Sequence, residues 1–301
     1  MHQDLINLGW TEEQWNRIRS TVTEEAQKAR VAAQLLPVTG PEDPSTVAIP
    51  NFTLTGEPNW TPPPPARLAV DSDPTLFLTT ISINVQVRTT DAADPELKGA
   101  LVMFRRAANH IARIEDALVF NGRAAPDIPP PTGLAGIPPV YEVKGHGIVP
   151  GIFRARGWGP KRRVAPVGAP APPPGPTLGQ LLVRAVSQAI SKLERRGQLG
   201  PYACVLGEDY FDAVCDPTAN LVLPRDRILP FLQGPLLRSS AIPRERGALI
   251  ALSGSPVEIV VATDIDVRYL QTTLEPRFVF RVCERVALRI KESKAIAVFG
   301  P

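Results

Sequence analysis

Apolar residues recur every three or four positions between residues 94 and 122, and this spacing predicts one long amphipathic helix. Asp94 is a favourable N-cap, Pro95 suits the first turn, and Gly122 is a typical stop. The apolar stripe consists of Leu97, Leu101, Phe104, Ala108, Ile111, Ile114 and Leu118. Glu115 and Asp116 fall near the negative end of the helix dipole, where a carboxylate is disfavoured. We therefore expect cationic partners for both, from elsewhere in the fold or from another subunit.

A second helix is predicted over residues 10–36, and it begins with a capping box formed by Thr11 and Gln14. Its apolar stripe is narrow and consists of Trp15, Ile18, Val22, Ala26 and Ala29. We interpret this stripe as too narrow for a core helix, so we expect it to bind a surface. The alternative, that the stripe packs the helix onto its own subunit, fits the pattern equally well.

Proline is unusually frequent, at 34 of 301 residues, and the prolines cluster in two segments. In residues 38–73, which include four consecutive prolines at 62–65, they force an extended backbone. This segment also carries Val47, Ile49, Phe52, Leu54 and Trp60. Such apolar residues are unusual in a free linker, so we expect an arm that lies on a partner.

The second proline-rich segment spans residues 123–176 and contains a predicted short strand at 148–153. A basic patch surrounds Trp158 and consists of Arg154, Arg156, Lys161, Arg162 and Arg163. Basic residues around an aromatic ring can bind nucleic acid. So short a run is more typical of a solvated or interface loop, which is the interpretation we favour.

Further strands are predicted at 76–88, 202–206, 248–252, 257–262, 266–270 and 295–299. The strongest pattern spans residues 277–291, where apolar even positions alternate with arginines, so one face packs on a core and the other is a row of arginines. That row is a candidate partner for Glu115 and Asp116. Another capped helix begins at Thr177, with Gln180 closing its capping box, and shorter helices are predicted at 208–214 and 225–233. The order of helices and strands after Thr177 suggests a small α/β subdomain.

Composition and motifs argue against an enzyme. The net charge is +3, which gives no global attraction to nucleic acid or membrane, and no apolar run approaches the roughly 18 residues that a membrane span needs. The three cysteines, Cys204, Cys215 and Cys283, show no pairing pattern, and an odd number fits a reducing cytoplasm.

No phosphate-binding loop, dinucleotide fingerprint or nucleophile elbow is present, and no histidine has a second ligand at metal-binding spacing. Asp264 and Asp266 are spaced more like a turn than a cation site. We therefore predict no catalytic residues, no cofactor and no metal.

Four segments follow one another in an order that points to a family. They are WTEEQWNRIRSTVTEEAQKAR, IARIEDALVFNG, LERRGQLGPYACVL, and VATDIDVRYLQ leading into FVFRVCERVALRIKESKAIAVF. In these segments the sequence resembles the encapsulins of the linocin-like type, bacterial nanocompartment shell proteins that share the tailed-phage major capsid fold. It departs from them in a longer, proline-rich region at 124–176 and in the four prolines at 62–65.

The resemblance implies an α+β fold of the tailed-phage major capsid type. It divides the chain into an N-terminal helix and arm at 1–49, an extended loop at 50–80, a peripheral domain with a long spine helix at 81–175 and 247–301, and an axial domain at 176–246. It places the N-terminal helix on the lumen wall, where similar shells bind a short C-terminal peptide of a cargo enzyme. Trp15, Ile18 and Val22 are the candidate cargo-docking residues. The loop expected to line the five-fold pore consists of Asp216, Pro217, Thr218, Ala219, Asn220, Leu221, Val222 and Leu223.

We therefore expect a structural protein that self-assembles into an icosahedral cytoplasmic shell of many copies around a cargo enzyme, without nucleic acid or a membrane. The alternative is a phage or prophage major capsid protein that encloses DNA. The N-terminus leads us to expect neither a scaffolding extension nor a cleaved leader, which favours the first function. Some phage capsids of this fold link a lysine of the extended loop to a neighbour's asparagine, but residues 50–80 contain no lysine, so no such link is expected.

Overall fold

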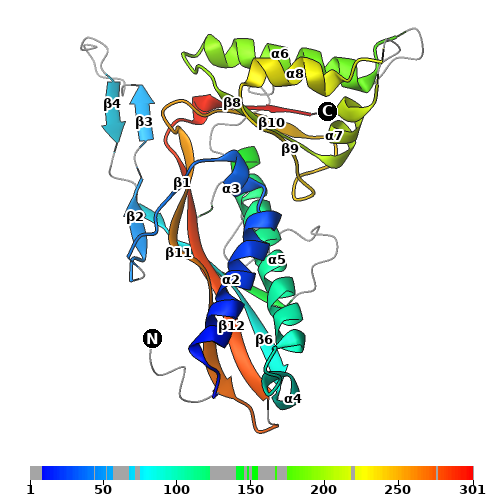
Figure 1. Cartoon of the computed structure of the whole chain (residues 1–301). Helices are drawn as coiled ribbons and strands as arrows, with labels where there is room; N and C mark the ends of the chain where they lie inside the picture. Colours follow the sequence, from blue (N-terminus) through cyan, green and yellow to red (C-terminus); the bar gives the residue numbers. More distant parts are fainter. Residues whose placement is uncertain are drawn as a thin grey trace.

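The computed structural model of the protein consists of two sheets with their helices and a separate thin arm (Figure 1). The structure describes residues 9–43, 45–51, 53–56, 68–71, 75–122, 140–145, 148, 151–154, 167, 175–217, 221–275 and 277–300. The predicted mixed α+β architecture is confirmed.

The long helix predicted from the apolar stripe is α5, Lys98–Asn121, and it is the spine of the larger part of the molecule. It begins a few residues later than predicted because Leu97 adopts a left-handed conformation, with φ of 53°. The Asp94 carboxylate still serves the helix start, since it accepts a hydrogen bond from the backbone N–H of Lys98 at 3.0 Å. Gly122, with φ of 69°, ends the helix as predicted.

The predicted N-terminal helix is two helices, α2 (Glu12–Ala29) and α3 (Ala32–Leu35), separated by a break at Arg30. The capping box of Thr11 and Gln14 is confirmed, with both side chains bonded to the reciprocal backbone N–H groups. In Figure 1 α2 lies alongside α5 over one face of the larger sheet. Trp10 continues this contact, because its Nε1–H donates to the carbonyl oxygen of Ala92 at 2.8 Å.

The larger sheet has the strand order β1-β11-β12-β6-β7. Its strands are β1 (Val38–Thr39), β11 (Val257–Thr272), β12 (Arg277–Ile290), β6 (Thr79–Arg88) and β7 (Tyr141–Lys144). All neighbours pair antiparallel except β1, which runs parallel to β11. The two strands predicted at 257–262 and 266–270 are one strand, because irregularities between Val261 and Asp266 shift its register without ending it. From β6 the chain passes through α4 (Thr89–Ala92) into the spine.

The smaller sheet has the order β13-β10-β8-β9. Its strands are β13 (Ile296–Phe299), β10 (Gly247–Ala251), β8 (Tyr202–Leu206) and β9 (Leu236–Arg238). Helices α6 (Leu178–Glu194), α7 (Glu208–Cys215) and α8 (Pro224–Leu232) share a hydrophobic core with it. The capping box of Thr177 and Gln180 at the start of α6 is confirmed.

The expected domain boundaries need a correction here. Residues 247–301 were assigned to the peripheral domain, yet β10 pairs with β8, and β13 pairs with β10. These two strands therefore complete the smaller sheet, and only β11 and β12 of that segment belong to the larger sheet. The short 3₁₀ turn η3 (Ser293–Ala295) connects β12 to β13.

The expected extended loop is a thin arm of two short ladders (Figure 1). In the arm, β2 (Ala48–Pro50) pairs with β5 (Thr75–Phe77), and β3 (Thr53–Gly56) pairs with β4 (Leu68–Asp71). The four consecutive prolines lie outside the described residues, as does most of the basic patch around Trp158. The strand predicted at 148–153 is wrong: residues 152–154 form the 3₁₀ turn η1 (Ile152–Arg154), and β7 forms earlier in the chain.

Candidate functional site

The three candidate docking residues on α2 are core residues of their own subunit. Trp15, Ile18 and Val22 are 2%, 0% and 0% exposed and belong to the same hydrophobic core as α5 and β12. The ring of Trp15 meets Phe280 of β12 edge to face, with centroids 6.1 Å apart, and Trp10 stacks on the same Phe280 at 5.0 Å.

Our interpretation of the stripe as too narrow for a core helix is therefore wrong. Counting apolar positions underestimated the buried surface, because each aromatic ring can bury about 150–250 Å². A cargo peptide cannot touch Ile18 or Val22 unless α2 moves, since neither side chain has exposed surface. Cargo docking at this helix stays a prediction.

The candidate pore loop lies between α7 and α8. Asp216 is the C-cap of α7, Leu223 is the N-cap of α8, and residues 218–220 lie outside the described part of the chain. Leu221 is 85% exposed, Val222 before α8 is 45% exposed, and Phe231 of α8 is 57% exposed. This loop and α8 therefore present aliphatic and aromatic side chains to their surroundings, which is typical of a contact surface.

The arginine row of β12 holds the arm onto the larger sheet. Arg285 donates to the carbonyl oxygen of Thr46 at 2.5 Å, and Arg289 donates to the carbonyl oxygen of Pro50 at 3.2 Å. Arg289 also pairs with Glu258 of β11 at 2.6 Å. We expected these arginines as candidate partners of Glu115 and Asp116. That expectation is wrong, because the row faces the arm, whereas the spine helix lies on the opposite face of the sheet.

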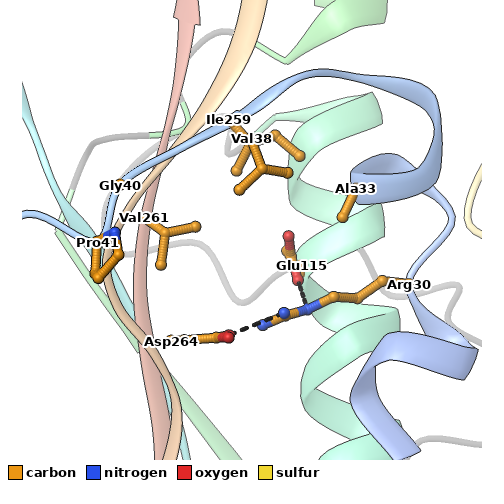
Figure 2. Close-up of a pocket in the computed structure, with 9 residues that line it drawn as sticks. All are labelled: Arg30, Ala33, Val38, Gly40, Pro41, Glu115, Ile259, Val261 and Asp264. Atoms are coloured by element: carbon orange, nitrogen blue, oxygen red, sulfur yellow. Dashed lines mark hydrogen bonds and ion pairs between the residues drawn. The ribbon is translucent and has the colours of Figure 1, made fainter. Parts of the chain in front are cut away.

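Glu115 instead pairs with Arg30, the residue at the break between α2 and α3. Arg30 Nε lies 2.6 Å from Glu115 Oε2, and Arg30 Nη1 lies 2.9 Å from Asp264 of β11 (Figure 2). The Nη2 group of Arg30 also contacts Glu284 of β12. We call these four residues, Arg30, Glu115, Asp264 and Glu284, the ionic joint, because they come from four different elements.

Asp116 is satisfied by backbone groups instead of a cation. Its carboxylate accepts hydrogen bonds from the backbone N–H of Val31 at 3.0 Å and of Ala32 at 2.7 Å, at the start of α3. An acidic side chain at a helix N-terminus is favourable. Burial and the charge of Glu115 nevertheless raise the pKa of Asp116 to about 8, against the lowering effect of the two N–H donors.

A small cavity of ≈ 130 Å³ opens beside the ionic joint (Figure 2). Glu115 and Asp264 line its polar end, and apolar side chains of β1 and β11, including Val38, Ile259 and Val261, form its wall. Gly40 also lines it, and φ at Gly40 is 122°, a conformation that favours glycine.

Sequence reasoning missed Arg30 and Glu284, although Glu284 left a signal. It is the one charged residue among the even positions of β12, whose other even members are apolar. A charge on a core-facing position of a strand indicates a buried partner. Arg30 left no such signal, because it falls within a segment whose pattern predicts uninterrupted helix.

The described residues offer no catalytic arrangement. Cys204 is fully buried, and burial raises the pKa of its thiol. No group of three His, Cys, Asp or Glu residues in the described ranges could hold a metal ion. Among the described helices, none is long and apolar enough to cross a bilayer.

Comparison with solved structures places the fold. A virus-like particle from Pyrococcus furiosus matches with a TM-score of 0.64 and 14% identity, over 95% of this chain and 99% of that chain. The Mycobacterium phage Bobi structure matches with a TM-score of 0.57 and 16% identity, over 92% of this chain and 90% of that one. The capsid of Myoviridae phage XM1 matches with a TM-score of 0.57 and 12% identity, over 88% of this chain and 89% of that chain. The expected capsid fold is confirmed.

No curated protein matches the chain in sequence. The family described as "encapsulating protein for peroxidase" matches residues 6–140 and 172–287, which is most of the chain. Members of this family are self-assembling structural shell proteins and not enzymes, as the sequence led us to expect. On this match and this fold, the chain belongs to the encapsulin family of linocin-like shell proteins.

Proposed function

We propose that many copies of this chain form a closed icosahedral shell in the cytoplasm and that this shell encloses a cargo enzyme. The main support for a closed shell is the arm, taken together with the chain's membership of the encapsulin family. Val47 and Phe77, on the arm and its approach, are 64% and 51% exposed, so at least half of the surface of each is uncovered within the subunit. Apolar side chains on a thin projection gain their burial from neighbouring copies.

Three free cysteines support the cytoplasmic location. Cys204, Cys215 and Cys283 form no disulfide with one another, which suits a reducing compartment.

The first experiment measures assembly. Size-exclusion chromatography and negative-stain microscopy of the purified protein should show hollow closed particles. A stable species near the 32.6 kDa of one chain would contradict the proposal.

The competing function is a phage or prophage capsid protein, since phage capsids share the fold. Particles produced with the chain's genomic neighbours should contain protein cargo and little nuclease-protected DNA. Particles filled with protected DNA would favour the phage function.

For the cargo, we propose docking on the exposed side of α2, with Trp15, Ile18 and Val22 supporting the helix from beneath. This proposal keeps the lumenal placement that the resemblance implies and takes account of the burial of the three residues. Ser20 lies on the exposed face, so Ser20→Trp should block a peptide there without touching the core.

The matched control is Ser187→Trp, on the exposed face of α6. We expect Ser20→Trp particles to be intact but poor in co-expressed cargo, and Ser187→Trp particles to fill normally. Equal filling of both would place docking elsewhere, while assembly itself would remain established by the first experiment.

A further inference from the structure

The ionic joint carries more negative than positive charge. One guanidinium, that of Arg30, contacts three carboxyl groups, and Asp116 lies next to Glu115 in the chain. The Asp264 side chain is 53% exposed, so water can solvate it, whereas the side chains of Glu115 and Glu284 are only 2% and 0% exposed. The charge imbalance is therefore concentrated on the two buried glutamates.

These two glutamates are neighbours by geometry. They contact Nε and Nη2 of Arg30, which lie on the same edge of the planar guanidinium. Oε1 of Glu284 is buried and has no hydrogen-bond partner among the described residues. Two buried carboxylates side by side cannot both remain ionised at low cost, and a buried oxygen without a partner is itself unfavourable.

We propose that Glu115 and Glu284 share one proton, and that this proton is a latch which holds the break between α2 and α3 against the spine and the sheet. With the proton in place, the guanidinium balances one carboxylate charge, and the protonated carboxyl can donate to its neighbour. Without it, two carboxylates repel one another around a single cation. The ionic joint at Arg30 then weakens, and the segment that leads from α3 into the arm is held less firmly.

A proton suits this place better than a metal ion. Arg30 occupies the centre of the carboxyl groups, and a guanidinium repels a second cation. No set of three ligating side chains forms in the described residues either. Within the described part of the chain, the charged groups that act on Glu284 are Arg30, Glu115 and Asp264, with Asp116 beside Glu115, and β6 places Ile81 opposite Glu284.

The latch has a direct structural readout. The backbone N–H groups of Val31 and Ala32 donate to Asp116, directly beside Glu115. These amides stay hydrogen-bonded to Asp116 only while α3 lies against the end of α5. Their hydrogen exchange therefore reports the joint, whether or not the subunit is in a shell.

The direction of the pH effect follows from burial. Burial, and then the charge of Glu115, raise the pKa of Glu284 well above its ordinary value, while burial raises the pKa of Glu115 and Arg30 counteracts it. A carboxyl whose pKa is higher in the folded than in the unfolded chain binds more protons when folded, so its contribution to stability is lost as the pH rises. The latch is therefore closed at low pH and opens as the pH rises.

The test compares wild type with Glu284→Gln, whose neutral amide imitates the protonated carboxyl. Hydrogen exchange of Val31 and Ala32, corrected for the pH dependence of the intrinsic rate, is followed from acidic to alkaline pH. In wild type the protection should be lost as the pH rises, and in Glu284→Gln the midpoint of this loss should lie at least about one pH unit higher. The same change at the exposed Glu275, in Glu275→Gln, is the control and should leave the midpoint unchanged.

A second measurement is spectroscopic. Infrared difference spectra of wild type in D₂O between acidic and alkaline pH should show the carbonyl stretch of buried protonated carboxyl groups disappearing. Asp116, whose pKa is raised to about 8, contributes such a band in both proteins, so the loss of band intensity should be smaller in Glu284→Gln than in wild type by the share of the joint's proton. Equal midpoints in wild type and Glu284→Gln, or an equal loss of band intensity in the two proteins, would overturn the proposal.

Discussion

Ile18 is the residue at which a core role and a direct docking role predict opposite results. Its side chain has 0% exposure and lies in the core shared by α2, α5 and the larger sheet. Truncation to alanine removes buried methyl and methylene groups and leaves a cavity, which costs about 2–5 kcal/mol. At about 2 °C per kcal/mol for a chain of this size, Ile18→Ala should melt about 4–10 °C lower than wild type.

The matched control is Ser20→Ala, two positions further along α2 and exposed. It should change stability by less than about 0.5 kcal/mol. Both variants are melted at one scan rate, because the melting temperature of an assembly that unfolds irreversibly depends on that rate. Cargo per particle is measured by gel densitometry. We expect Ile18→Ala particles to be less heat-stable and to carry normal cargo. An unchanged melting temperature with empty particles would refute the placement of Ile18 in the core.

Three further predictions follow from other parts of the subunit. Phe231→Asp, at a 57% exposed position on α8, should lower the yield of closed particles in negative-stain images, while the circular dichroism spectrum of the unassembled subunit should stay unchanged. Gly40→Ala should destabilise the subunit by more than about 1 kcal/mol in a urea titration, because a Cβ at this φ of 122° would lie 2.1 Å from the carbonyl oxygen of Val261. Boiling in detergent should release only monomer on a gel, since residues 50–80 contain no lysine for a loop cross-link, and a ladder of linked subunits would contradict this.

Local signals in the sequence were sufficient for much of the fold. The capping boxes at Thr11 and Thr177 fixed two helix starts, and the alternation in residues 277–291 identified β12. Each of these rests on contacts within a few residues, which a pattern can reveal.

Contacts between residues that lie far apart in the sequence could not be predicted from such local patterns. Arg30 and Glu284 lie 254 positions apart, so the helical pattern around Arg30 gives no information about Glu284, and the strand pattern around Glu284 gives none about Arg30. The domain boundary was wrong for the same reason, because β10 and β13 pair with each other and β10 pairs with β8 across long stretches of chain. The accessibility of the candidate docking residues was misjudged for the same reason. Trp15 belongs to a narrow apolar stripe, which suggested an accessible side chain, and only the packing around Phe280 shows that it is buried.

The placement of charge and apolar surface suggests how this subunit can assemble without covalent links. The part of the subunit formed by α2, α5 and the larger sheet is held together by the aromatic cluster around Phe280 and by the ionic joint. The arm is attached at its base by Arg285 and Arg289, while its own apolar side chains, such as Phe77, stay exposed. A rigid base with an exposed apolar projection loses little conformational entropy on association, so each contact between copies contributes more of its burial to affinity. Loosening the joint at Arg30 would release the segment that leads into the arm. For this reason the proton of the joint should affect the shell as well as the single subunit.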